Sequence, residues 1–71
     1  MKTVLVFKTS VRRKKEVRKL KTLLNKLIDY NGYWNFDLED CDNILRVETQ
    51  KLQAETVSSV LNMHGFDCEE L

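Results

Sequence analysis

The stretch WNFDLEDCDNILRVET (residues 34–49) decides the fold, because its pattern is typical of a β-hairpin. Apolar side chains alternate with polar ones on both sides of a polar turn at residues 39–43. A period of two indicates strands with one buried face. The residues expected to face the core are Trp34, Phe36 and Leu38 from the first strand and Leu45 and Val47 from the second.

The residues before the hairpin predict a strand and then a helix. Residues 3–8 are rich in β-branched and aromatic side chains, which favour a strand. Apolar residues then recur at intervals of three and four over residues 11–29, as on one face of a helix. We expect Ser10 to cap this helix at its start and Asn31-Gly32 to end it.

The same order of elements follows the hairpin. Residues 52–64 have apolar side chains at helical spacing, and Gly65 is expected to end this helix because it tolerates the left-handed conformation. Residues 66–69 alternate again and predict a last short strand. The order β-α-β-β-α-β predicts an α+β, ferredoxin-like sandwich, in which two helices cover one face of a four-stranded antiparallel sheet of order 4-1-3-2. Residues 1–71 are expected to form one domain.

The charges of the chain are strongly segregated, although its net charge is only +1. Residues 1–28 carry ten basic and one acidic side chain, a net charge of +9, whereas residues 29–71 carry two basic and ten acidic ones, a net charge of −8. The two halves should therefore attract each other or partners of opposite sign. No apolar run is long enough for a membrane span or a signal peptide, and the two cysteines form no close pair. We expect free thiols and a cytoplasmic location.

Three segments carry a family likeness: MKTVLVF at the start, the hairpin, and VLNMHGFDCEEL at the end. In these the chain resembles the heavy-metal-associated domain of copper chaperones and metal-pumping ATPases, over nearly all of its length. The resemblance implies the same fold, with a metal-binding loop before the first helix. The family's Met-x-Cys-x-x-Cys signature is missing, since matching Val11 to its methionine leaves Arg13 and Glu16 at the cysteine positions. A guanidinium offers no lone pair to a metal, so we expect no cofactor there.

A basic cluster at the start of the first helix is the main candidate binding site. Its residues are Arg12, Arg13, Lys14, Lys15, Arg18 and Lys19. Together with the free N–H groups of a helix start, these side chains would suit a phosphate, a nucleic-acid backbone or an acidic protein. The alternative is a solvated helix face whose charges are offset by the hairpin turn, where Glu39, Asp40 and Asp42 lie at the same end of the sheet.

The uncovered face of the sheet is a second candidate surface. Val4, Val6 and Ile44 are expected there as a small apolar patch, at which two copies of the chain could form a homodimer. Scattered surface valines are also normal in monomers. No aromatic residue is expected on the two central strands of this face, so nucleic-acid binding would be weak and insensitive to sequence.

A relocated metal site would need the soft ligands Cys41, His64 and Cys68. The two cysteines are expected at opposite edges of the sheet, about 14 Å apart, which is too far for a shared ion. His64 and Cys68 could approach each other, but two ligands complete only half of a tetrahedral shell. Structural roles for both residues are therefore favoured, and the metal site remains an alternative.

The sequence offers no set of residues for catalysis. It has one histidine and no glycine-rich phosphate loop, so nucleophile, base and stabilising group cannot all be assigned. We expect a small non-catalytic interaction domain that recognises an acidic protein surface or an anion. The alternatives are a copper- or zinc-handling protein with a non-standard site, a weak nucleic-acid binder, and a relic of a metal-binding ancestor without a ligand.

Overall fold

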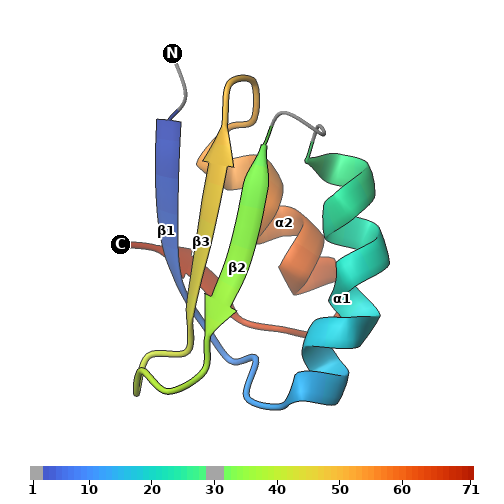
Figure 1. The fold of residues 1–71 in the computed structure, drawn as a ribbon, viewed down its shortest axis with the longest axis vertical. Coiled ribbons are helices and arrows are strands. Elements are labelled where there is room, and N and C mark those ends of the chain that lie inside the picture. Colours follow the sequence, from blue (N-terminus) through green and yellow to red (C-terminus); the bar gives the residue numbers. More distant parts are fainter. Residues whose placement is uncertain (1–2, 29–31) are drawn as a thin grey trace.

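The computed structural model describes residues 3–28 and 32–71. The elements are β1 (Thr3–Thr9), α1 (Lys14–Leu27), β2 (Tyr33–Asp37), β3 (Ile44–Thr49), α2 (Ala54–Met63) and β4 (Cys68–Glu70). The strands form one antiparallel sheet in the order β2-β3-β1-β4, which is the expected order 4-1-3-2 read from the other edge. Both helices lie over the same face of the sheet (Figure 1). The predicted α+β fold is confirmed.

Strand pairing places the alternating apolar residues of the hairpin on the helix side of the sheet. Trp34 lies opposite Val47, and Phe36 lies opposite Leu45. On the other side of β3, Leu5 and Phe7 of β1 continue these two rows. Buried side chains from the sheet, from both helices and from the segments next to α1 form one hydrophobic cluster: Leu5, Phe7, Val11, Leu20, Leu24, Ile28, Leu45, Val47, Val57, Leu61 and Cys68.

Thr9 joins the end of β1 to the hairpin turn and to the loop before α1. Its side chain is buried, with 6% of the residue exposed. The Thr9 hydroxyl donates a hydrogen bond of 2.6 Å to the carbonyl of Asn43 and accepts one of 3.2 Å from the backbone N–H of Val11. The backbone N–H of Thr9 also donates to the carbonyl of Asp42 at 3.2 Å. The hairpin turn therefore lies at the same end of the sheet as the start of α1, as expected.

The first helix is shorter than predicted, and Ser10 does not cap it. The Ser10 hydroxyl accepts a hydrogen bond of 2.8 Å from the backbone N–H of Asp67 instead. Because Val11 is fully buried, the chain stays extended until this side chain has reached the core, and the helix begins three residues later. At the other end, residue 29 of the expected helix and Asn31 of its expected stop lie outside the described residues.

The second helix ends at Gly65, as predicted. Gly65 has a φ of +87°, and the backbone N–H of Phe66 donates to the carbonyl of Leu61 at 3.0 Å. The backbone N–H of Gly65 donates to the backbone carbonyl of Asn62 at 3.1 Å, which completes the hydrogen-bond pair of a Schellman motif. Within residues 3–28 and 32–71, neither helix has the length and apolar character needed to cross a membrane.

Candidate functional site

The start of α1 is capped by an acidic side chain of its own first turn. The carboxylate of Glu16 accepts hydrogen bonds from the backbone N–H groups of Arg12, at 3.0 Å, and Arg13, at 3.1 Å. These bonds lower the pKa of Glu16, that from Arg12 most; the charges of Arg13 and Lys15 lower it further, while partial desolvation opposes the shift. The Glu16 carboxylate therefore already binds two of the N–H groups beside the helix start, those of Arg12 and Arg13, and places a negative charge where the sequence suggested an anion.

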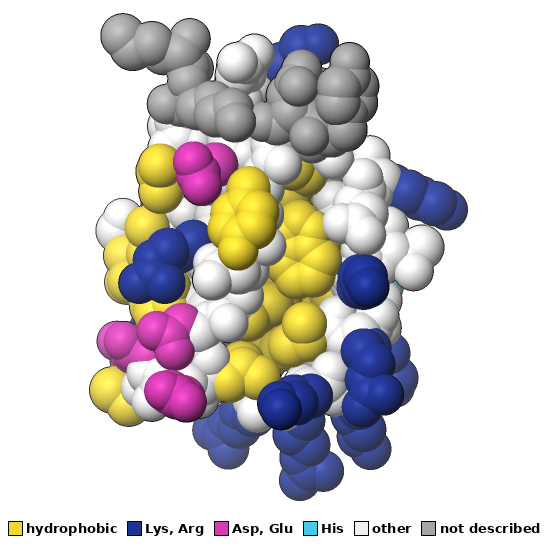
Figure 2. Space-filling model, in the orientation of Figure 1, with side chains coloured by type: hydrophobic (Ala, Val, Ile, Leu, Met, Phe, Trp, Pro, Cys, Tyr) yellow, Lys and Arg dark blue, Asp and Glu magenta, His cyan; other side chains and the backbone are white. Residues whose placement is uncertain are grey.

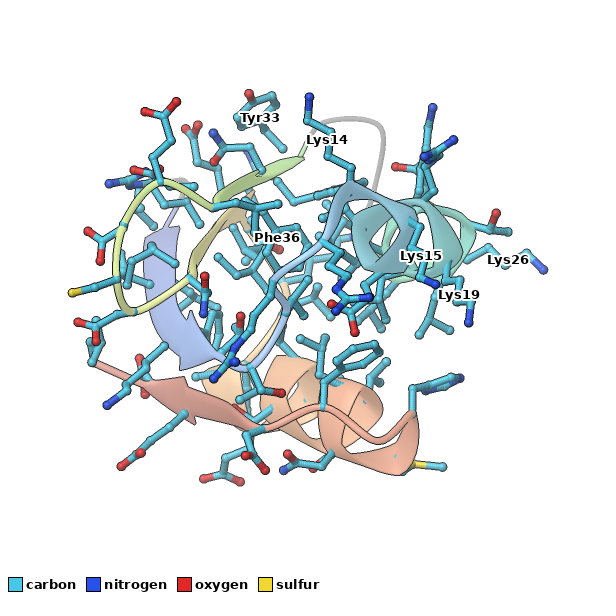
Figure 3. All side chains as sticks on the ribbon, turned by 90° about the horizontal axis from the view of Figure 1, so that it is seen from below. Lys14, Lys15, Lys19, Lys26, Tyr33 and Phe36 are labelled. Carbon is cyan, nitrogen blue, oxygen red and sulfur yellow. The ribbon has the colours of Figure 1, made fainter. Side chains whose placement is uncertain are left out.

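The six basic residues of the predicted cluster are all exposed, but they do not form one group. Lys14 and Arg18 line a groove beside β2, whereas Arg12 lines a separate polar cavity. Figure 3 shows Lys14 on the side of α1 toward the strand of Tyr33, with Lys15 and Lys19 pointing away from it. Arg13 is the N-cap residue of the helix. The structure therefore divides the predicted site into faces with different neighbours.

The hairpin turn does not offset these charges by direct ion pairs. Asp42 lies 3.9 Å from the ammonium nitrogen of Lys8, on the neighbouring strand. In the part of the chain that the structure describes, no carboxylate lies within 4.0 Å of the charged group of Lys14 or Arg18. Lys14 and Arg18, which form the cationic face of α1 toward β2, are therefore available to an outside partner as far as the described residues are concerned.

An apolar groove of about 720 Å³ runs between β2 and the first half of α1. Its apolar lining comes from Val17, Trp34, Phe36 and Leu38, all half-buried, and its other lining residues are Lys14, Arg18, Asn35, Asp37 and Glu39. In Figure 2 hydrophobic side chains run down the middle of this face, with basic ones at the lower right over α1. The sequence pattern assigned Trp34, Phe36 and Leu38 to the core. The sequence offered one signal for a groove. The predicted strand order placed these three residues on an edge strand, which has a neighbouring strand on one side only.

Trp34 fixes one end of the groove to α1. Its indole N–H donates a hydrogen bond of 2.8 Å to the side-chain oxygen of Asn25. The ring of Trp34 also meets that of Phe36 edge to face, with centroids 6.0 Å apart and an interplanar angle of 75°. Such a pair holds both rings in one orientation, so the apolar floor is formed before any ligand arrives.

A polar cavity of about 570 Å³ lies between the hairpin turn and β4. Both Cys41 and Cys68 line it, because the turn bends toward β1 and is held there through Thr9. The strands β2 and β4 are at opposite edges of the sheet, as expected, but the bend of the turn brings Cys41 to the cavity that Cys68 also lines. Cys68 is buried and Cys41 exposed, and both are free thiols.

The alternative metal ligands His64 and Cys68 have other partners. The Nδ1 atom of exposed His64 lies 2.8 Å from the carbonyl oxygen of Val60, one turn earlier in α2. Burial raises the pKa of the Cys68 thiol, against a smaller opposite effect of its hydrogen bond with Ser58, so the thiolate that metals bind is disfavoured. One group of potential ligands occurs within the described ranges, and it contains neither residue: Asp40, Cys41 and Asp42, whose ligand atoms lie within 4.8 Å of one another.

The uncovered sheet face differs from the predicted apolar patch. Val4 is 56% exposed and Val6 is half-buried, but Ile44 is only 5% exposed and so offers little surface to a partner. Strand pairing also places exposed Tyr33 on this face, opposite Glu48 and in the same row as Val4. An aromatic residue is therefore present on the edge strand, although the central strands have none on this face. Homodimerisation through the patch stays a prediction.

Comparisons of the chain with protein-family models, curated proteins and solved structures found no significant match.

Proposed function

We propose that this chain is a non-catalytic interaction domain that binds an acidic protein segment through the cationic face of α1. The observation that carries the proposal is the charge of this helix. Its sequence holds six basic side chains and one acidic one, a net charge of +5, and the acidic one is engaged at the helix start. A net positive charge of this size on one helix attracts an acidic partner and speeds its association.

The surroundings of the cations favour a protein over a free anion or a nucleic acid. Lys14 and Arg18 border an apolar groove with two aromatic rings in its floor. A phosphate group would use the cations but leave the apolar surface exposed to water. A polypeptide can contribute carboxylates and apolar side chains together, and burial of apolar area supplies most of the affinity of such contacts.

We place the domain in the cytoplasm, on the scaffold of a heavy-metal-associated domain that has replaced its metal-binding cysteines by a capped, cationic helix start. Metal handling through His64 and Cys68 is disfavoured by the burial of the Cys68 thiol and its raised pKa. Catalysis is not part of the proposed role.

The emission of Trp34 provides the test, since this residue is the single tryptophan of the chain and lines the groove. The parent chain is titrated with poly-L-glutamate at salt concentrations of about 50 mM and about 300 mM. We expect saturable binding at low salt that weakens at high salt. Arg18→Glu should weaken it more than the matched control Arg46→Glu, since Arg46 is exposed on the other face of the sheet. Absence of binding at low salt would end the proposal. A parallel titration with heparin separates the ligand classes, since binding of heparin without binding of poly-L-glutamate would favour a nucleic-acid ligand.

A further inference from the structure

The two edges of the sheet are protected to different degrees. β4 has three residues, two of them glutamates, and short charged strands are a common protection of a sheet edge. β2 has five residues, YWNFD, with neither lysine nor proline. In the described structure β2 pairs with β3 on one side and has no strand on the other. The N–H and C=O groups on its outer side are therefore available to an added strand.

The groove lies where the side chains of an added strand would go. A strand beside β2 would direct every second side chain toward the helix layer, since side chains alternate between the faces of a sheet. The floor that these side chains would meet contains Phe36 and Val17, with Leu38 at the end nearest the hairpin turn. The edge and the groove together thus offer backbone hydrogen bonds and an apolar contact surface, the two components of peptide recognition by strand addition.

The helix wall of the groove carries a row of cations. Lys14, Arg18, Lys21 and Asn25 follow one another at intervals of four, three and four, so they share one face of α1. The first two line the groove, and Asn25 contacts Trp34 at its other end. Lys21 therefore lies beside the groove, between these points. A strand on β2 would have positive charge along its helix side, while Asp37 and Glu39 lie only at the hairpin end.

Charge distinguishes a foreign peptide from a second copy of this chain. If two copies paired through β2 about a twofold axis, the sheet would become continuous and the two α1 helices would be neighbours on the same face. Each helix has a net charge of +5 and would repel the other. An acidic segment would be attracted instead.

We propose that β2 and its groove bind an extended segment of a partner protein, rich in glutamate or aspartate and in apolar residues, by adding it as a fifth strand to the sheet. The proposal rests on the proposed function and names its partner's conformation and composition. The segment would cover the five residues of β2, about 17 Å at the rise of a strand. Its helix-side apolar groups contact Phe36 and Val17, and its carboxylates lie near Lys14, Arg18 and Lys21.

The probe is a fluorescein-labelled nine-residue peptide with glutamate at every third position and valine or leucine elsewhere. Because a strand has a period of two, either face of this peptide presents both residue types. One control peptide has the same sequence with alternate backbone nitrogens methylated, which removes donors for strand pairing but keeps charge and composition. A second has glutamine for glutamate. We expect binding of the probe by anisotropy, and at least tenfold weaker binding of each control.

Two double variants with the same change of charge locate the contact. Lys14→Glu with Arg18→Glu alters the groove side of α1, and Lys15→Glu with Lys19→Glu alters a side that points away from it. We expect about a tenfold loss of affinity from the first pair and about twofold from the second. Circular dichroism verifies that both variants remain folded.

Other results would overturn the inference. Equal losses from the two double variants, or full binding of the methylated peptide, would refute strand addition and leave a general cationic contact in place. Binding of poly-L-glutamate without binding of the probe would have the same meaning, whereas binding of neither would end the proposed function as well. A dimer in sedimentation that the groove-side double variant strengthens would identify a second copy as the occupant of β2.

Discussion

Replacement of Thr9 by valine tests how the corner between sheet and first helix is held. Valine has nearly the shape of threonine, so Thr9→Val removes the hydroxyl without leaving a cavity. The hydroxyl makes two hydrogen bonds, to the carbonyl of Asn43 at 2.6 Å and from the N–H of Val11 at 3.2 Å. After the substitution both backbone groups lose their partner, and the bond to Val11 is buried.

The expected cost follows from these two bonds. A buried donor left without a partner costs about 1–3 kcal/mol, and the loss of a typical hydrogen bond costs about 0.5–1.5 kcal/mol. We therefore expect Thr9→Val to lower the free energy of unfolding by about 2–3 kcal/mol. In a domain of this size each kcal/mol changes the melting temperature by about 4–8 °C, so the melting temperature should fall by roughly 8–24 °C.

Urea and thermal unfolding, followed by circular dichroism, measure this difference. The matched control is Thr9→Ser, which keeps the hydroxyl and removes one buried methyl group, at a cost of about 1 kcal/mol. Thr9→Val should therefore be the less stable of the two. If it equals or exceeds Thr9→Ser in stability, the hydroxyl does not hold the corner and the reasoning is refuted.

Three further predictions concern single side chains. The pKa of Glu16 is lowered by folding. Its ionised form therefore contributes stability that is present above the ordinary pKa of 4.5 and is lost as the pH falls through the lower folded value. Measurements of the unfolding free energy against pH should show that Glu16→Gln is less stable than the parent at neutral pH and loses less stability below about pH 4.5. Gly65→Ala should cost about 1 kcal/mol in urea unfolding, because the φ of +87° strains alanine while its Cβ meets no atom within 4 Å, and Gly65→Asn should cost less. Exposed Cys41 should react with a maleimide in the native state, whereas buried Cys68 should react only as the chain unfolds; equal rates in the native protein would contradict the burial of Cys68.

The sequence predicted the fold well because its local signals agreed with one another. The period of two in the hairpin and the spacing of three and four in the helices both indicated the buried faces that the structure shows. Gly65 was predictable because a left-handed residue at a helix end favours glycine. The prediction that Ser10 caps the first helix was wrong. Serine is a common N-cap residue, but the start of the helix is displaced by the burial of Val11, which is a tertiary effect.

The candidate site was predictable only in part. The basic residues were evident from composition, but their division between two sides of α1 depends on the orientation of the helix over the sheet. The capping role of Glu16 was not predicted, although an acidic residue in the first turn of a helix is a recognisable signal. The groove was not predicted, although the expected strand order already placed this strand at an edge; the alternating pattern alone does not separate the half-burial of Trp34 and Phe36 from full burial.

The most direct test of strand addition to β2 is a map of backbone amide signals of the isotope-labelled chain, recorded during titration with the acidic–apolar peptide. Strand addition at β2 predicts the largest changes in Tyr33–Asp37, with slowed hydrogen exchange of the outer amides of this strand, and further changes at Lys14 and Arg18. Changes confined to β4 or to the uncovered sheet face, or the same map obtained with the methylated peptide, would contradict it.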